Sequence, residues 1–182
     1  MEIVLYPDPI LRVQTANVLE IDETLAERVG AMIRLMHSSS GIGLAAPQIG
    51  WNARLFVCNP SREDGGTDRV FINPEILSWS GRDVREEGCL SLPGILGKVV
   101  RPTSIRIRAY DLDGEEIEEE MEGLLARVFQ HEHDHLEGIL IIDKMSPAER
   151  LGVERDLKEL EDRYNKARPK AAQRAPGGGA GR

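Results

Sequence analysis

The stretch GLLARVFQHEHDHLEG, residues 123–138, has the apolar spacing of a helix that is buried over much of its surface. Its apolar side chains cover nearly half of a helical circumference, next to a face that carries two histidines. They are Leu124, Leu125, Val128, Phe129 and Leu136. Because other elements must cover such a helix, we expect it at the centre of the domain, with the rest of the chain packed around it.

Three of the four histidines in the chain lie in this helix. His131 and His135 are four residues apart, so they lie one above the other, whereas His133 points roughly 160–200° away. His131, Glu132 and His135 form the pattern H-E-x-x-H, which provides two neutral ligands and a carboxylate that can take a proton from water. A surface helix rich in histidine and acid is the alternative. Buried His and Glu need partners, however, so the expected burial favours a metal site and leaves His133 as a bystander.

A catalytic metal needs a third protein ligand and one open position. A metzincin-type protease would have a third histidine at position 141, where this sequence has Ile141. A thermolysin-like protease would use a later glutamate such as Glu154, but exposure on a charged helix is the simpler interpretation of that residue. Cys89, in REEGCLSLPG, is the remaining candidate and would form a Cys-His₂ site. A structural role is the alternative for a lone cysteine.

The segments before the central helix contain one helix and several strands. Helical spacing over residues 22–40, with Gly41 following as a stop signal, predicts a helix whose apolar residues are Leu25, Val29, Met32, Ile33 and Met36. His37, at its end, is expected to be a cap or surface residue. RLFVCN (54–59) and RVFINPEIL (69–77) are typical strands, and SIRIRAYDLDGEEIEEEME (104–122) is typical of a hairpin turning at Asp113-Gly114.

A third helix is expected from about Pro147 to Tyr164. We therefore predict an α+β fold, in which antiparallel β-sheets pack around a central H-E-x-x-H helix, with an N-terminal helix before it and a C-terminal helix after it.

Composition narrows the class of protein further. The chain has 182 residues, a formal net charge of −8 and two cysteines, Cys58 and Cys89. Two cysteines form no disulfide framework, so Cys58 is expected to be a buried thiol in a reducing compartment. No signal peptide and no bilayer-spanning stretch is found, and the acidic balance argues against DNA binding. We expect a cytoplasmic protein with neither DNA nor membrane as a partner.

Three segments in one order resemble the signature motifs of the peptide deformylase family: GIGLAAPQ (41–48), EGCLS (87–91) and QHEHDHLEG (130–138). The resemblance covers roughly residues 3–165 and includes YPDPILR near the N-terminus. It implies a bacterial or organellar metallohydrolase that removes the formyl group of nascent N-formylmethionyl peptides and releases formate. An H-E-x-x-H metallopeptidase and a non-catalytic metal-binding module are the alternatives.

The resemblance also implies a role for each motif residue. Cys89, His131 and His135 would bind one divalent metal, Fe²⁺ in the cell, with Ni²⁺, Co²⁺ or Zn²⁺ possible in purified protein. Glu132 would pass a proton from water to the leaving amine. The Gln48 amide and the backbone N–H of Leu90 would stabilise the tetrahedral intermediate. Taken alone, Gln48 after a proline would be a turn residue.

The substrate-binding residues are implied in the same way. Backbone around Ile42 and Gly43 would pair with an extended peptide, with Gly88 on its other side. The methionine side chain would enter a pocket made by Gly43, Leu90, Leu124, Val128 and His131. The sequence departs from the family pattern at Leu96, where a basic residue is common, and this departure concerns how the downstream backbone of the substrate is held.

Two further expectations concern charges and boundaries. Asp134 has Arg127 or Arg101 as a possible partner that would fix the central helix, with a plain surface ion pair as the alternative. Residues 1–166 are expected to form a single catalytic domain of the deformylase type, and residues 167–182 a disordered basic Pro/Gly/Ala tail. Basic residues there make the ribosome near the exit tunnel a candidate partner, with an incidental solubilising tail as the alternative. They are Arg168, Lys170 and Arg174, and Lys166 stands next to them at the end of the domain.

Overall fold

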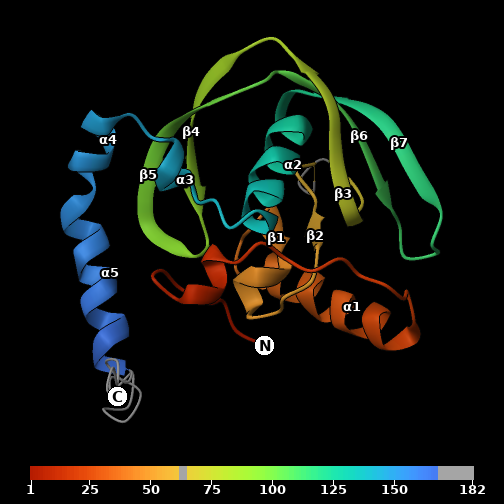
Figure 1. Ribbon diagram of the computed structural model, residues 1–182, viewed down its shortest axis with the longest axis horizontal. Helices are drawn as coiled ribbons and strands as arrows, with labels where there is room; N and C mark the ends of the chain where they lie inside the picture. The colour runs from red at the N-terminus through yellow and green to blue at the C-terminus, as the bar shows by residue number, and fades with distance from the viewer. Residues whose placement is uncertain (62–64, 168–182) are drawn as a thin grey trace, which may run out of the picture.

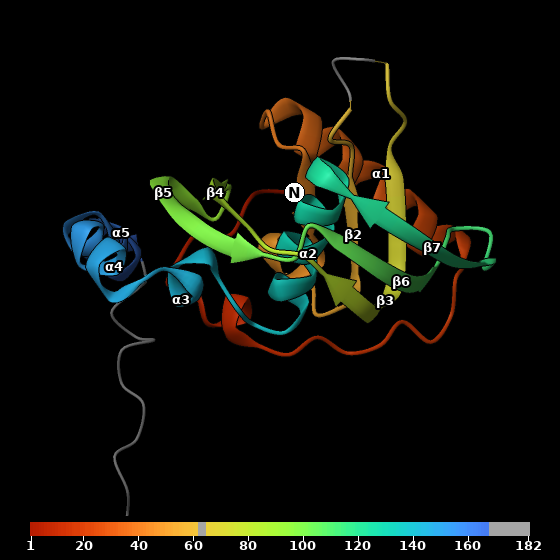
Figure 2. The ribbon, with the colours of Figure 1, turned by 90° about the horizontal axis from the view of Figure 1, so that it is seen from above.

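Helix α2 (Gly123–Leu136) lies at the centre of the fold, as predicted, with a sheet on either side (Figures 1 and 2). The computed structural model describes residues 1–61 and 65–167, so the predicted tail beyond Ala167 lies outside the described residues. Among the described residues, no helix is both long and apolar enough to cross a membrane.

A five-stranded antiparallel sheet covers one side of α2. Its order is β1-β2-β3-β6-β7, and the strands are β1 (Gly43–Ala45), β2 (Leu55–Cys58), β3 (Arg69–Ser80), β6 (Ser104–Tyr110) and β7 (Glu116–Glu122). The predicted hairpin is confirmed, because β6 pairs with β7 along its whole length. Asp111 closes its turn by accepting hydrogen bonds from the backbone N–H groups of Asp113 and Glu115 at 2.9 Å.

Three phenylalanine rings fasten α2 to this sheet. Phe56 of β2, Phe71 of β3 and Phe129 of α2 are fully buried, and their ring centroids lie 5.0–5.1 Å apart. Removing one such ring from a packed core typically costs about 3–5 kcal/mol of unfolding free energy. This contact therefore determines which face of α2 points towards the large sheet, and the face that carries His131 and His135 points elsewhere.

A separate two-stranded sheet lies on the other side of α2 and was only partly expected. It pairs β4 (Asp83–Cys89) with β5 (Leu92–Arg101). Cys89 was expected in a strand or at a strand end, and it is the last residue of β4. The pairing register shifts between Gly88 and Cys89, and this irregularity occurs where β4 reaches the histidine face of α2.

The helices agree with prediction at the N-terminus and differ at the C-terminus. Helix α1 (Glu23–Ser38) begins where Asp22 accepts a hydrogen bond from the Leu25 N–H at 2.7 Å, and its predicted apolar residues face the core. The predicted single helix over 147–164 is wrong. Helix α4 (Pro147–Gly152) ends, and α5 (Glu154–Ala167) begins after Val153. Glycine weakens a helix interior, which accounts for a break beside Gly152.

Three short helical segments were not predicted: η1 (Pro9–Arg12), η2 (Ala46–Ile49) and α3 (Ile141–Lys144). The helices α3, α4 and α5 lie beyond β4 and β5, on the side away from the large sheet (Figure 2). Cys58 is fully buried, as expected, and burial raises the pKa of its thiol to about 12. Glu154 is exposed, as expected.

Candidate active site

A cavity of about 570 Å³ opens between β1, the end of β4 and the first turns of α2. Most of the candidate residues from the sequence line it: Ile42, Gly43, Gln48, Gly88, Cys89, Leu90, Leu124, Val128, His131 and Glu132. Both sheets end beside this cavity, since β1 is the first strand of the large sheet and β4 is one of two strands in the small one. The fold therefore brings three sequence segments, far apart in the chain, to one hollow.

Cys89, His131 and His135 form a group whose ligand atoms all lie within 4.8 Å of one another. The two histidines share a face of α2, as their spacing predicted, and Cys89 Sγ lies 3.3 Å from His135 Nε2. Ligand atoms of a tetrahedral Cys-His₂ site stand about 3.3–3.6 Å apart, from metal–ligand bonds of about 2.0–2.3 Å. One thiol and two imidazoles at this spacing fit a divalent first-row metal.

Glu87 orients one of the ligands. His131 Nδ1 donates to Glu87 Oε2 at 2.9 Å, which leaves His131 Nε2 for the metal. Although burial opposes ionisation, hydrogen bonds from His131 and Arg101 hold the pKa of Glu87 well below its usual value. Glu87 is therefore a carboxylate at neutral pH, an acceptor that selects the His131 tautomer suited to metal binding.

The two ligand histidines have opposite pKa shifts. Burial favours the neutral form of His131, but hydrogen bonds with Cys89 and Glu87 outweigh it and raise its pKa to about 10. For His135, burial and then the neighbouring His131 charge lower the pKa well below its usual value. Since a metal binds neutral imidazole, binding would release the proton that His131 holds.

Glu132 is buried beside the metal-ligand group. Its side chain is 3% exposed, and its Oε2 has no hydrogen-bond partner among the described residues. Burial raises its pKa to about 7. The carboxylate lies so close to Gly43 that a Cβ at that position would be 2.8 Å from Glu132 Cδ. A carboxylate that titrates near neutral pH at a cavity wall is suited to accept and return a proton.

Gln48 has both of the roles considered from the sequence. Its Oε1 accepts a hydrogen bond from the Ala45 N–H at 2.8 Å, which is a turn contact. Its Nε2 lies 3.3 Å from Ser91 Oγ and 3.5 Å from Cys89 Sγ. The turn contact therefore holds the amide so that its N–H group points towards the metal-ligand group.

The remaining histidines lie outside the metal-ligand group. His133 projects from the other side of α2, where its Nε2 lies 3.2 Å from Arg54 Nη2 and its ring stacks on Phe129. The prediction that His133 is not clustered with the two ligand histidines is thus confirmed. At the end of α1, His37 Nε2 lies 2.7 Å from Asp68 Oδ1.

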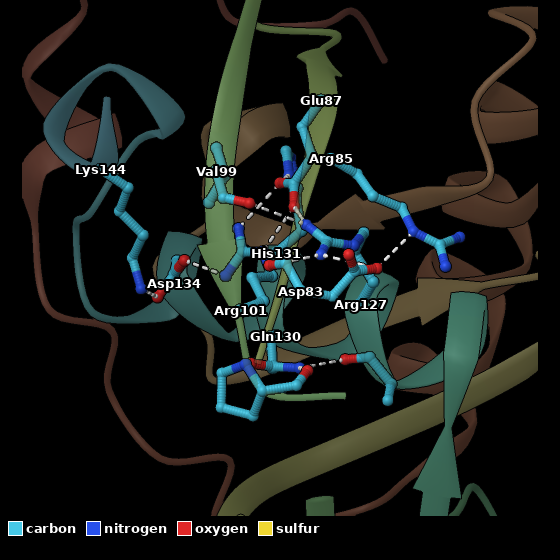
Figure 3. Close-up of polar contacts among 12 residues, drawn as sticks. Asp83, Arg85, Glu87, Val99, Arg101, Arg127, Gln130, His131, Asp134 and Lys144 are labelled. Carbon is cyan, nitrogen blue, oxygen red and sulfur yellow. Dashed lines mark hydrogen bonds and ion pairs between the residues drawn. The ribbon is translucent and has the colours of Figure 1, made fainter. Parts of the chain in front are cut away.

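Of the two partners considered for Asp134, the structure favours Arg101. Arg101 Nη1 donates to Asp134 Oδ2 at 2.8 Å, and Lys144 Nζ lies 2.9 Å from Asp134 Oδ1 (Figure 3). Arg101 is 2% exposed, so the alternative of a plain surface ion pair is wrong. Arg127 instead donates to Glu87. The sequence reasoning missed Glu87 as a site residue, although it stands inside EGCLS, because no local pattern shows what a carboxylate on a strand contacts.

Known proteins that are similar to this chain are peptide deformylases. The sequence matches the model of the family described as polypeptide deformylase over residues 1–151. It is 45% identical over 166 residues to peptide deformylase 1B, chloroplastic/mitochondrial, of Arabidopsis thaliana, which covers 90% of this chain but 61% of the plant protein. It is 46% identical over 160 residues to the peptide deformylase of Acidobacterium capsulatum, covering 87% and 94% of the two chains. A crystal structure of peptide deformylase from Plasmodium falciparum matches with a TM-score of 0.89 at 41% identity, covering 93% of this chain and all of that one.

Proposed function

Because the chain belongs to the polypeptide deformylase family, we propose that it hydrolyses the N-formyl group of N-formylmethionyl peptides and releases formate. One observation carries the proposal. Glu132 and Gln48 converge on the same cavity as the group formed by Cys89, His131 and His135. This combination provides a metal site, a proton carrier and an oxyanion donor around one space.

Cys89, His131 and His135 would hold one divalent metal ion. When bound, the ion would polarise the formyl carbonyl and lower the pKa of a water molecule beside it. We propose Fe²⁺ as the ion in the cell because the family resemblance implies it, although intrinsic affinity favours zinc. Ni²⁺, Co²⁺ or Zn²⁺ would be able to replace it, because a thiolate with two imidazoles suits several first-row ions. Oxidation of Cys89 in air would then accompany loss of iron-dependent activity.

Glu132 would carry the proton through the reaction. The oxygen of water forms a bond to the formyl carbon while Glu132 accepts the proton of that water. The C–N bond then breaks, and Glu132 delivers the proton to the leaving amine, so that formate and a free N-terminus result. The burial of Glu132 and its pKa near 7 support this role, since the group can be deprotonated before the step and protonated after it.

Gln48 and Leu90 would stabilise the negative charge that develops on the formyl oxygen. Gln48 Nε2 already points to the Cys89 sulfur, and Leu90 follows Cys89 in the cavity wall. Backbone and amide N–H groups in such positions need no rearrangement during the reaction. Loss of one donor of this kind typically lowers the rate by about 10²–10³-fold.

The peptide would bind as an added strand between the two sheets. Ile42 and Gly43 lie at the β1 side of the cavity, and Gly88 lies at the β4 side. A strand between them could form main-chain hydrogen bonds without reading most side chains. Leu124 and Val128 would contact the methionine side chain, as their apolar character and position in the wall support.

The two alternative functions each conflict with a specific residue. A metzincin-type peptidase needs a third histidine where the chain has Ile141, which is 3% exposed and part of an apolar cluster. A non-catalytic metal-binding module has no need of a buried glutamate such as Glu132, whose Oε2 has no hydrogen-bond partner among the described residues. Neither alternative accounts for Gln48 beside Cys89.

Formate release is the direct test. Protein purified without oxygen and loaded with iron, nickel or cobalt should release formate from formyl-Met peptides. It should act poorly on acetyl-Met peptides, because the extra methyl group crowds a site built for hydrogen. Equal rates on the two substrates, or no formate from any loaded form, would refute the proposal.

Domain extent, location and partners are further parts of the proposal. We propose one catalytic domain over residues 1–166 and a cytoplasmic location, although the plant relative is named chloroplastic/mitochondrial. Nascent peptides would be the partners, and the ribosome a candidate through the tail beyond Ala167. Co-sedimentation with ribosomes at low salt, compared for the full chain and a chain ending at residue 164, tests that contact.

A further inference from the structure

The carboxylate of Glu87 is the meeting point of a buried network on one side of His131 (Figure 3). Its Oε1 accepts hydrogen bonds from Arg101 Nε at 2.6 Å and from Arg127 Nη1 at 2.7 Å. Its Oε2 accepts from Arg101 Nη2 and from His131 Nδ1, both at 2.9 Å. With two donors on each oxygen, all four bonds are made in one orientation of the carboxylate.

Arg127 belongs both to this network and to the wall of the cavity. It precedes His131 by one turn of α2, and its side chain is 8% exposed. Besides Glu87, its guanidinium donates to the carbonyl of Val99 and to the carbonyl of Asp83, each at 3.2 Å. Because these acceptors come from both β4 and β5, they hold the planar guanidinium in place and tie α2 to the small sheet.

Arg101 is held independently of Arg127. Its Nη1 donates to Asp134 at 2.8 Å, and Lys144 supports the other oxygen of Asp134 at 2.9 Å. Removing the Arg127 guanidinium would therefore leave Arg101 in position, but Glu87 Oε1 would keep one of its two donors. The predicted result is a Glu87 carboxylate held by three hydrogen bonds instead of four, two from Arg101 and one from His131, and therefore positioned less firmly against His131.

We propose that Arg127 is a positioning residue for the metal ligand His131, acting through Glu87. The inference rests on the proposed metal site, since it assigns the function of a residue that touches no ligand atom. A carboxylate that accepts the ring N–H of a ligand histidine fixes the orientation of that ring, and loss of such a partner typically costs about 10–100-fold in metal affinity or activity. Because Arg127 acts one step further out, we expect an effect at the lower end, about 10-fold.

The experiment compares Arg127, which is buried, with Arg54, which is half-buried and contacts His133 on the other side of α2. Arg127→Met keeps an unbranched apolar side chain and removes every donor, whereas Arg127→Lys keeps the charge but not the planar fork. Arg54→Met is the matched control, because Arg54 is 14% exposed, donates to the Pro74 carbonyl and contacts His133, and among the described residues it makes no hydrogen bond or ion pair with Glu87. The rate of cobalt release to a chelator is measured for each folded variant, with thermal unfolding as a check.

The expected result is cobalt release about 10-fold faster for Arg127→Met, an intermediate rate for Arg127→Lys, and the parental rate for Arg54→Met. Solvent exchange of the His131 ring N–H in the NMR spectrum of the cobalt form should be faster in Arg127→Met, and the ring N–H of His135 should not change. Parental cobalt release by Arg127→Met, or equal acceleration by Arg54→Met, would overturn the proposal.

Two further outcomes are separable. If Arg127→Met does not fold, Arg127→Lys takes its place. Cobalt release faster from Arg127→Lys than from Arg54→Met then supports the proposal, and equal rates overturn it. If the parent binds cobalt but releases no formate from formyl-Met peptides, the proposed function fails while the comparison of cobalt release still decides the role of Arg127.

Discussion

The two faces of α2 carry histidines that are similarly buried but have opposite pKa shifts. On the face towards β4, His131 is 12% exposed and lies between Glu87 and Cys89. On the face towards β2, His133 is 17% exposed and lies against Arg54 and the ring of Phe129. Burial alone therefore does not separate a ligand from a bystander.

The partners supplied by other elements make the difference. Hydrogen bonds with Cys89 and Glu87 outweigh burial and raise the pKa of His131, whereas burial and the Arg54 charge lower the pKa of His133. A cationic partner repels a metal ion, and a thiol with a carboxylate attracts one. One helix thus presents a metal-binding face and a structural face because different strands pack against each.

The largest expected effect is the loss of metal from one face only. His131→Ala and His135→Ala should each purify with little metal after loading with nickel or cobalt, because two ligands do not hold a catalytic ion. His133→Ala should keep the parental metal content and most of the activity. Elemental analysis after gel filtration checks this, and an empty site in His133→Ala would show that the two faces have been assigned wrongly.

The next effect separates metal binding from turnover on the metal-binding face. Glu132→Ala should keep its metal and lose turnover by about 10²–10⁴-fold, the usual contribution of a general acid–base. Glu137→Ala is the matched control, since Glu137 belongs to the other face and pairs with Arg54 at 2.7 Å. Steady-state formate release measures both, and similar losses in the two variants would contradict a specific role for Glu132.

A third effect tests how tightly β1 limits the position of Glu132. Gly43→Ala would place a methyl group against the Glu132 carboxylate, and displacement of about 1 Å can lower a rate by about 10²-fold. Metal content should not change, because Gly43 is not a ligand. Gly152→Ala is the control, since among the described residues no heavy atom beyond its chain neighbours and the backbone of its own helix lies within 4 Å of a Cβ at that position. Parental turnover in Gly43→Ala would mean that Glu132 can move without consequence.

The smallest effect concerns stability and pH in metal-free protein. Burial raises the pKa of Glu132 from its ordinary 4.5 to about 7, so the folded state retains a proton that the unfolded chain loses. This contribution to the unfolding free energy is complete below about pH 4.5 and disappears as pH rises through about 7. We expect a loss on the order of 1–2 kcal/mol, because relaxation reduces the cost of a buried charge.

Chelator-treated protein and Glu132→Gln provide the comparison. Denaturant unfolding at pH 5 and pH 8 should show a steeper fall in stability for the parent than for Glu132→Gln, which cannot titrate at this position. Both proteins carry His131→Ala in this comparison, because the charge of Glu132 raises the pKa of His131 and the two titrations would otherwise be coupled. Parallel pH profiles would show that the carboxylate of Glu132 is solvated in the folded state.

Local periodicity explains which elements could be predicted. The apolar spacing of α1 and α2 and the Asp113-Gly114 turn depend on neighbouring residues, and each was found at the expected place. The small sheet of β4 and β5 was only partly foreseen, since its pairing joins residues on both sides of the Cys89 turn in a run without clear alternation. The break at Val153 was missed because the charged spacing continues across it.

The sequence by itself determined that His131 and His135 face the same way and that His133 does not, because helix geometry places residues four apart on one face. Its three family motifs also named Cys89, Glu132 and Gln48 as site residues. Only the tertiary structure decided that Cys89 lies 3.3 Å from a histidine 46 positions later in the chain, and that Glu87 meets Arg101, Arg127 and His131. Contacts and pKa values of this kind depend on which surfaces pack together and exclude water, which no local pattern of residues specifies.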